Sequence, residues 1–317
     1  MKKILVTGCS GFIGMHLCRG LLKRGENVFG IDNVNDYYSL TLKKARLEIL
    51  KEDDNFNFLK IDLCDLDSLG SVFTEYNPEI VVNLAAQAGV KYSLVNPHAY
   101  IESNIIGFMN ILECSRINDV ERLVYASSSS VYGGNKNLPF SEKDRADKPL
   151  SIYSVSKKTN ELMAFSYSHL YGLPTTGLRF FTVYGPWGRP DMSYYIFCDR
   201  INKGLPITVY NNGDIQRDFT YIDDVIEGAI SAVYNSYKYE VFNLGNNRSE
   251  NIMDLIQIIE KELGKKADIN FMDCQPGDVK ATYADIEYSK KMLGYNPKTK
   301  ISAGIPLFVD WFKSYVS

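Results

Sequence analysis

The sequence predicts an α/β protein with an open, doubly wound parallel sheet and a smaller, loop-rich α/β part. Three observations predict this class. Short runs rich in β-branched and aromatic residues alternate with helical stretches through the first half of the chain. Glycine, small or polar residues follow most of these runs. Beyond about residue 182, aromatic, Gly, Pro and Asn residues become frequent. We therefore expect one domain at residues 1–181 and mainly a second at 182–317, with some segments interleaved.

The expected strands of the first half follow one another at regular intervals. They are KILVTG, NVFGID, FNFLKID, EIVVNLAA, RLVYASS and TTGLRFF, at residues 3–8, 27–32, 56–62, 79–86, 122–128 and 175–181. Helices are expected from Phe12 to Arg24, from about Ala99 to Ile117 and from about Tyr153 to Tyr171. Alternation of strands and helices predicts a parallel sheet with helices on both faces.

A ligand site is predicted at one edge of this sheet. In an open parallel sheet, ligands bind outside the carboxyl ends of the strands. Small or polar residues stand at six of the expected ends: Gly8, Asp32, Asp62, Ala85, Ser127 with Ser128, and Thr182. Six such ends together are a stronger signal than any one of them.

Composition argues against several classes of protein. The net charge of −3 gives no reason to expect nucleic acid as a partner. No apolar run reaches the roughly 18 residues that span a bilayer, and the apolar run near the N-terminus is too short for a signal peptide. Six scattered cysteines without a CxxC pair are typical of reduced thiols in a cytoplasmic protein. Three histidines without metal-ligand spacing predict no bound metal.

The stretch TGCSGFIG at residues 7–14 predicts a dinucleotide site. Gly8, Gly11 and Gly14 follow a strand and open a helix, the context that makes a glycine-rich motif credible. Missing side chains let the backbone approach a pyrophosphate, whose charge the helix N-terminus favours. Asp32 ends the next strand, where a carboxylate can bind a ribose and would repel a 2′-phosphate, so a Rossmann-like site for NAD is predicted. Three basic residues nearby keep NADP open: Lys43, Lys44 and Arg46.

The stretch YSVSK predicts a catalytic pair. Tyr153 and Lys157 are four residues apart and share one face of the expected helix. An ammonium group near a phenol stabilises the phenolate, so we expect the pKa of Tyr153 to fall from about 10 toward neutrality. Tyr153 would then be a general base for a hydroxyl group, and Ser128 in YASSSSVYG could hydrogen-bond the same hydroxyl. Each motif alone is common, but the three in this order predict an active site.

Five motifs together resemble the extended short-chain dehydrogenase/reductases that act on nucleotide sugars. They are TGxxGFIG, NLAAQAGV, the serine-rich segment before VYG, YxxxK and RDFTYIDDV. The resemblance covers essentially the whole chain. Two further stretches, DNVNDYYSLTLKKARL and FFTVYGPWGRPDM, are similar to UDP-glucuronate 4-epimerases. Trp187 and Gly188 depart from that pattern, in which longer polar residues usually precede the arginine.

The resemblance implies a set of cofactor-binding residues. They are Gly8, Gly11, Phe12, Ile13, Gly14, Asp32, Asn33, Asp62, Leu63, Ala85, Ala86, Lys91 and Asn104, with the catalytic pair Tyr153 and Lys157. Asp62 and Leu63 would border the adenine. Ala85 and Ala86 would line the cofactor path. Lys91 and Asn104 would lie near the nicotinamide side.

The resemblance also implies a substrate site. Its residues are Ser127, Ser128, Thr182, Arg189, Arg217 and Asp278. Thr182 and Arg189 would face the sugar. Arg217 would bind the diphosphate, and Asp278 would hold the uridine ribose.

The activity that the resemblance implies is NAD-dependent 4-epimerisation of UDP-glucuronate to UDP-galacturonate through a transient 4-keto sugar. Where this chain has SSSSVYG, the dehydratases of this superfamily have segments similar to TDEVYG or TSELYG, and the glucuronate decarboxylases have segments similar to TSEVYG. Because neither Ser129 nor Ser130 is a carboxylate, elimination and decarboxylation lose a candidate acid, whereas epimerisation loses nothing.

Two other functions stay open. A 4-epimerase of neutral UDP-hexoses would differ in whether a cation faces C6 of the sugar. A non-catalytic NAD or nucleotide-sugar binding protein would not need Tyr153, Lys157 and Ser128. The resemblance also implies a homodimer, paired through the helices that begin near Ala99 and Tyr153.

Overall fold

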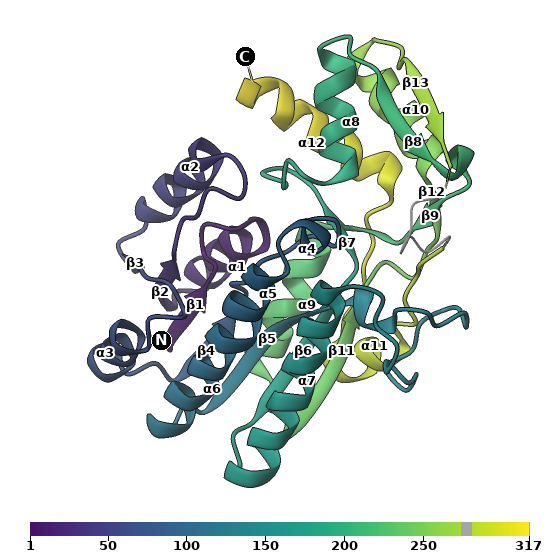
Figure 1. Cartoon of the computed structure of the whole chain (residues 1–317). Helices are drawn as coiled ribbons and strands as arrows, with labels where there is room; N and C mark the ends of the chain where they lie inside the picture. Colours follow the sequence, from purple (N-terminus) through teal and green to yellow (C-terminus); the bar gives the residue numbers. More distant parts are fainter. Residues whose placement is uncertain (274–280, 317) are drawn as a thin grey trace.

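The structure is a computed structural model that describes residues 1–273 and 281–316 (Figure 1). A seven-stranded parallel sheet forms its centre, in the strand order β11–β6–β5–β4–β1–β2–β3. This order confirms the predicted doubly wound α/β class. The strands are β1 Lys3–Thr7, β2 Asn27–Asp32, β3 Phe56–Lys60, β4 Ile80–Asn83, β5 Arg122–Ser128, β6 Thr175–Phe180 and β11 Tyr239–Leu244.

The central strands are apolar on both faces because helices cover both. In β1, Ile4, Leu5 and Val6 are all fully buried. Such a continuous apolar run is typical of a parallel sheet, in contrast to the alternating pattern of a half-exposed strand. The register sets Thr7 opposite Ile31 of β2 and Asn83 of β4, which brings the carboxyl ends of neighbouring strands together.

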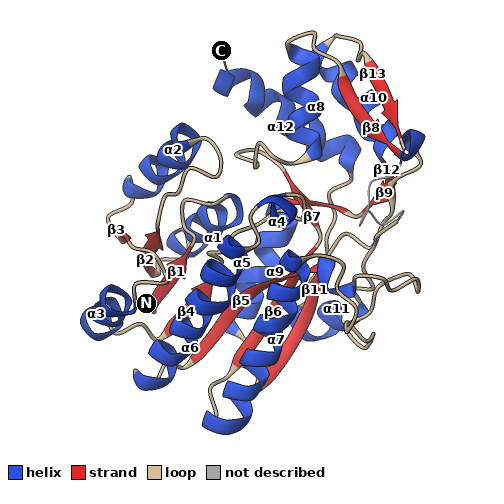
Figure 2. Cartoon of the chain, in the orientation of Figure 1, coloured by secondary structure: helices blue, strands red, loops and turns tan. Residues whose placement is uncertain are grey.

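Two layers of helices enclose the sheet (Figure 2). One layer shares a hydrophobic cluster with the β1 side chains Ile4 and Val6: α1 Phe12–Leu22, α2 Leu40–Lys51, α9 Ile222–Tyr234 and α11 Glu287–Leu293. The other shares a second cluster with Leu5: α3 Leu66–Tyr76, α6 Gly107–Ile117 and α7 Ile152–Tyr171. In the described residues, no helix has the length and hydropathy needed to cross a bilayer.

Helix α7 occupies the predicted range and has clear end signals. The Ser151 side chain accepts a hydrogen bond from the backbone N–H of Ser154, which caps the first turn. Gly172 ends the helix in the left-handed conformation that glycine adopts without strain. These local signals explain why the range of α7 could be predicted.

The helix expected from about Ala99 to Ile117 is not uniform. Short helices α4 Tyr92–Val95 and α5 His98–Tyr100 lead into a π-helix, η1 Ile101–Ile106, which continues as α6. Asn104 in this π-helix bonds to the backbone of Gln87 and to the Ser156 hydroxyl. The apolar pattern predicts helical backbone, but it does not distinguish an α-helical turn from a π-helical one.

The second half of the chain builds a smaller part at the carboxyl edge of the sheet. Its helices are α8 Ser193–Asn202, α10 Ile252–Leu263 and α12 Ile301–Val316. Three strand pairs accompany them: β7 Thr182–Tyr184 with β10 Phe219–Tyr221, β8 Ile207–Tyr210 with β13 Ile269–Met272, and β9 Gln216–Arg217 with β12 Glu250–Asn251. Two short 3₁₀ turns, η2 Ser129–Tyr132 and η3 Asn211–Gly213, complete the elements described. Because α9 and β11 return to the main sheet, this half contributes to both parts of the molecule. The domain division near residue 181 stays a prediction.

Candidate functional site

A cavity of about 1050 Å³ lies at the carboxyl edge of the sheet, lined by residues of both parts. Its wall includes all but one of the predicted site residues that the structure describes. The exception is Asn104. Asp278, predicted to hold the uridine ribose, lies outside the described residues.

The glycine-rich loop has the shape of a pyrophosphate cradle. Gly8 has a φ of +72°, and a Cβ there would lie 2.7 Å from the backbone nitrogen of Ala85. A Cβ on Gly14 would lie 2.0 Å from the carbonyl oxygen of Gly8, so only glycine lets α1 begin directly beneath the loop. Gly11 caps α1 without a side chain, and the first turn contains no acid. The first amides of α1 therefore fit an anionic phosphate.

Acidic and amide side chains line the wall beside this cradle. Asp32 accepts hydrogen bonds from the backbone N–H groups of Ser10 and Val34, which fixes its carboxylate at the end of β2. Asn33 donates to Asp62 at 2.8 Å. Burial alone would raise the pKa of Asp62, but the hydrogen bonds from Asn33 and Cys64 outweigh it and lower that pKa. Two fixed carboxylates suit ribose hydroxyls and disfavour a 2′-phosphate.

Two of the three basic residues that kept NADP open are already engaged in hydrogen bonds. Arg46 is fully buried and donates to the Ser10 and Trp187 carbonyl oxygens among other acceptors. The Lys43 ammonium donates to the backbone and side-chain oxygens of Asn35, both at 2.7 Å. Lys44 is exposed on α2 and is absent from the cavity wall. This arrangement favours NAD over NADP.

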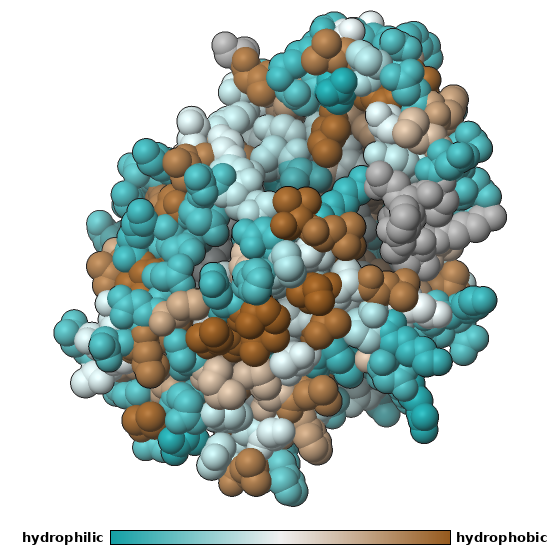
Figure 3. All heavy atoms as spheres, viewed as in Figure 1, coloured by the Kyte–Doolittle hydropathy of each residue, from teal (hydrophilic) through white to brown (hydrophobic). Residues whose placement is uncertain are grey.

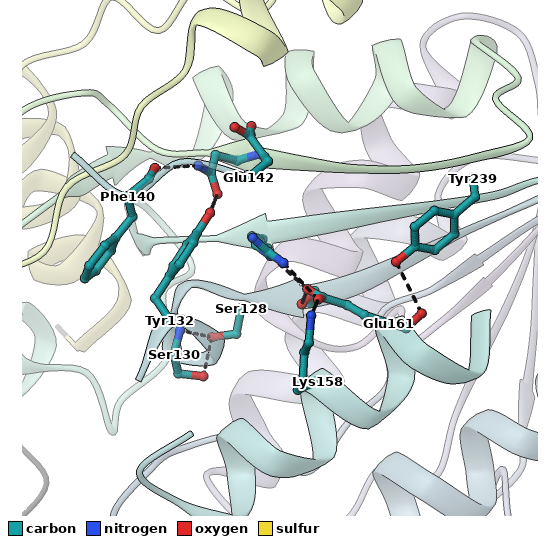
Figure 4. Close-up of polar contacts among 11 residues, drawn as sticks. Ser128, Ser130, Tyr132, Phe140, Glu142, Lys158, Glu161 and Tyr239 are labelled. Atoms are coloured by element: carbon teal, nitrogen blue, oxygen red, sulfur yellow. Dashed lines mark hydrogen bonds and ion pairs between the residues drawn. The ribbon is translucent and has the colours of Figure 1, made fainter. Parts of the chain in front are cut away.

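The catalytic cluster lies where α7 faces the end of β5. Tyr153 and Lys157 both line the cavity, and the Lys157 ammonium donates to the carbonyl oxygen of Ala126 at 3.0 Å. Ser128 accepts hydrogen bonds from the backbone N–H and hydroxyl of Ser130 (Figure 4). The ring of Tyr100 meets the ring of Tyr153 edge-on at 6.0 Å. The three predicted residues are thus brought together.

The pKa values differ from the expectation. The prediction that the pKa of Tyr153 falls toward neutrality is wrong for the protein alone. Burial raises the pKa of the Tyr153 phenol, and hydrogen bonding with Ser128 and the charge of Arg189 offset only part of that effect. Burial also lowers the pKa of Lys157 to about 8. Both shifts arise because the pair lies in a region of low dielectric.

A buried ion pair supports the cluster from behind. Glu161 extends the α7 face of Tyr153 and Lys157 by one turn. Its carboxylate accepts hydrogen bonds from Nε and Nη2 of Arg179 at 2.8 and 2.9 Å. The same carboxylate accepts a hydrogen bond from the Ser127 hydroxyl at 2.7 Å and pairs with Lys158 (Figure 4). Sequence reasoning missed Glu161, although its spacing of four from Lys157 is a signal that could have found it.

Asn104 plays a different part from the one expected. Its side chain is buried, and its bonds to Gln87 and Ser156 occupy both its carbonyl oxygen and its amide. The residue therefore joins the loop after β4 to α7 instead of lining the cavity.

The cavity wall also carries the predicted sugar residues. Thr182, Arg189 and Arg217 all line it, and Lys91, which lines it too, has its ammonium 4.6 Å from the Tyr210 ring centre. Arg189 forms a two-pronged ion pair with Asp191, two residues further along the chain.

The fold and this site define an extended short-chain dehydrogenase/reductase. A glycine cradle for a dinucleotide and a Ser–Tyr–Lys cluster open into one cavity, and a second part closes over it. More specifically, the chain belongs to the GDP-mannose 4,6 dehydratase family, which matches residues 5–307.

Several known proteins are similar over the full chain. Protein CapI of Staphylococcus aureus is 51% identical over 331 residues, covering 99% of both chains. UDP-glucuronate 4-epimerase 4 of Arabidopsis thaliana is 45% identical, covering 99% of this chain and 76% of that protein. The crystal structure of UDP-glucuronic acid 4-epimerase from Bacillus cereus, in complex with UDP-glucuronic acid and NAD, has a TM-score of 0.93 at 36% identity, covering 99% of both chains.

Proposed function

We infer that this chain is an NAD-dependent nucleotide-sugar epimerase that interconverts UDP-glucuronate and UDP-galacturonate. One observation carries this function: Ser128, Tyr153 and Lys157 share a cavity with the glycine cradle and with Arg189. The similarity to UDP-glucuronate 4-epimerases supports the choice of sugar. Within the family, the dehydratase name does not carry over, because Ser129 and Ser130 supply no acid beside the catalytic serine.

The chain's own residues move the proton at the sugar 4-hydroxyl. Bound NAD⁺ supplies the acceptor and later the donor of hydride at C4. Because burial raises the pKa of Tyr153 in the protein alone, its phenolate would form only with the positive charges of bound NAD⁺ and of Lys157 nearby. As the phenolate, Tyr153 takes the proton of the 4-hydroxyl while Ser128 orients that hydroxyl. Lys157, held on the Ala126 carbonyl, keeps a positive charge beside the phenolate. After the 4-keto sugar presents its other face, Tyr153 returns the proton to the oxygen.

Arg189 is the proposed grip on the sugar carboxylate. Asp191 accepts hydrogen bonds from Nε and Nη2 of the Arg189 guanidinium. Among the hydrogen bonds of the described residues, none uses Nη1, so that end can bind a ligand. Arginine can hold two carboxylates through two edges of its planar fork. We also propose Thr182 as a sugar contact and Arg217 as the diphosphate contact, and both line the same wall.

The direct test of this function is product analysis. The protein is incubated with UDP-glucuronate and, separately, with UDP-glucose, and the products are identified by NMR. UDP-galacturonate from the first incubation is expected. Conversion of UDP-glucose alone would favour the second candidate, a 4-epimerase of neutral UDP-hexoses. One observation favours that candidate: Asp191 already neutralises the cation that would face C6. A protein that binds both sugars and converts neither would be a binding protein.

We predict that the purified protein carries tightly bound NAD. The glycine cradle and Asp32 bind it, and a reaction without net oxidation gives no need to release it between turnovers. Denaturing the protein should release NAD or NADH, measured by chromatography of the supernatant. Heat-denatured protein that has first been stripped by charcoal is the control. Activity that requires added NADP and ignores NAD would contradict the role assigned to Asp32.

We propose that two copies pair through α6 and α7. Apolar side chains gather on the face formed by α4, α6 and α7 (Figure 3). On α7, Leu162 is 59% exposed and Phe165 is 53% exposed, and Met109 on α6 is also exposed. Contiguous apolar surface of this kind marks an association site.

Replacing Phe165 with glutamate is expected to shift the mass in sedimentation velocity from twice 35.9 kDa toward 35.9 kDa. A charge on the apolar face would have to be buried in the dimer at high cost. Leu205→Glu, an exposed leucine in the second part, is the matched control. An unchanged dimer in Phe165→Glu would place the interface elsewhere.

We further propose a cytoplasmic location, which five free cysteines among the described residues support.

A further inference from the structure

The loop that carries Arg189 is held by a distant segment of the chain. This segment follows β2 and includes Tyr37 and Arg46, within the stretch that resembles UDP-glucuronate 4-epimerases. The proposed chemistry gives neither residue a role. Both nevertheless contact residues 187–191, the loop between β7 and α8.

Arg46 fixes the beginning of that loop. Its Nη2 donates to the carbonyl oxygens of Trp187 at 2.5 Å and Gly188 at 3.1 Å, while its Nη1 donates to the Ser10 carbonyl at 3.0 Å in the glycine-rich loop. The guanidinium thus joins the dinucleotide cradle to the sugar loop. Its complete burial removes competition from water for these bonds.

Trp187 shows that the loop conformation is imposed. It has a φ of +62°, a left-handed conformation that bulky residues rarely adopt. Such a conformation persists only where the surroundings fix it. Arg46 fixes its carbonyl, and the rings of Trp311 and Tyr315 on α12 hold its side chain at ring-centre distances of 5.3 and 5.5 Å. Arg189 follows two residues later.

Tyr37 fixes the other end of the loop. Its hydroxyl donates to Oδ2 of Asp191 at 3.2 Å, and Asp191 in turn accepts from Nε and Nη2 of Arg189. Burial and the Asp191 charge raise the pKa of Tyr37 to about 12, so the hydroxyl remains a donor at neutral pH. The Arg189 and Asp191 side chains are 22% and 29% exposed, so a ligand in the cavity can reach them.

We propose that Tyr37 and Arg46 are positioning residues that orient Arg189 so that its open end faces the carboxylate of the bound sugar. The proposal rests on the function proposed above. It implies that recognition of a uronate depends on two residues of the cofactor-binding half, neither of which needs to touch the sugar.

Two conservative variants test the proposal. Tyr37→Phe removes one hydroxyl and keeps the ring that packs on Tyr92. Arg46→Lys keeps the charge and loses the fork. The matched controls are Tyr76→Phe, whose hydroxyl donates to the Asn27 carbonyl, and Arg122→Lys, whose guanidinium donates to the Val233 and Tyr234 carbonyls at the opposite edge of the sheet.

Each test variant is expected to raise KM for UDP-glucuronate about three- to tenfold, the effect of one or two lost hydrogen bonds. A larger share of the oxidised sugar should also be lost as CO₂, because a poorly held carboxylate can rotate into the reactive orientation. In Tyr37→Phe, the Kd for UDP-glucose, the bound NAD content and the melting temperature should stay near the wild-type values. In Arg46→Lys, which also loses a bond to the glycine-rich loop, the KM and CO₂ readouts are compared with the bound NAD content and the melting temperature of the same variant. Both control variants should match the wild type in every assay.

These outcomes distinguish failure of the positioning role from failure of the proposed function. Equal losses on both sugars, or an unchanged KM and CO₂ yield, would overturn the positioning role. If Arg46→Lys does not fold, Tyr37→Phe decides alone. If Arg189→Ala discriminates against UDP-glucuronate and Tyr37→Phe does not, only the positioning role fails. If the wild type does not convert UDP-glucuronate at all, the proposed function fails and this inference fails with it.

Discussion

Tyr153→Phe is expected to reduce turnover of UDP-glucuronate by about a hundred- to ten-thousand-fold, the range that general-base catalysis contributes. Phenylalanine keeps the ring against Tyr100 but has no oxygen to accept the proton of the 4-hydroxyl. Because the phenol contributes to the chemical step, the Kd for UDP-glucuronate, measured by calorimetry, should change little. A rate above about a tenth of the wild-type value would require a different base.

Two further variants sharpen this result. Lys157→Ala should also impair turnover, with part of the loss appearing as weaker retention of NAD, because Lys157 lines the same cavity as the glycine cradle. Tyr100→Phe is the matched control, since it removes a hydroxyl from a ring that contacts Tyr153. The Tyr100 hydroxyl donates to the Ala88 carbonyl, so its loss should affect the loop more than the chemical step.

Arg189→Ala is expected to lower kcat/KM for UDP-glucuronate about ten- to a hundredfold, the effect of losing a charge-assisted pair of hydrogen bonds. Any activity on UDP-glucose should fall much less. The variant should also release CO₂ and a 4-keto pentose. Oxidation at C4 makes the uronate a β-keto acid, which loses CO₂ when the C5–C6 bond aligns with the carbonyl π system. Steady-state kinetics on both sugars and analysis of the products measure these effects.

Asp191 complicates the Arg189 variant and supplies its control. Removing the guanidinium leaves the Asp191 carboxylate without its cationic partner in the proposed sugar subsite, where it would repel a uronate. The double variant Arg189→Ala/Asp191→Asn removes both charges and isolates the lost grip. An equal loss on both sugars, in the single and the double variant, would assign Arg189 to the fold or the diphosphate and would favour the neutral-hexose function.

Much of the fold could be predicted because its signals are local. The alternation of apolar strands with helices gave the doubly wound sheet, and the caps Ser151 and Gly172 define α7 within the chain segment itself. The seventh strand β11 was not predicted. It is separated from its partner β6 by the whole α8–α9 region, and pairing over that distance leaves no periodic signal.

The sequence by itself determined that one group of residues meets at the cavity. Gly8, Asp32 and Ser128 end strands of one parallel sheet, and Tyr153 and Lys157 share one turn of a helix, so spacing alone places them. Only the tertiary structure decided the burial, the charge pairing and the pKa of each group there. Arg189 pairs with Asp191 two residues away, but the Tyr37 hydroxyl that holds Asp191 comes from a segment far away in the chain. The pKa of Tyr153 rises because packing removes water from it. Charge pairing and burial depend on which segments pack together, and no local pattern in the chain encodes that contact.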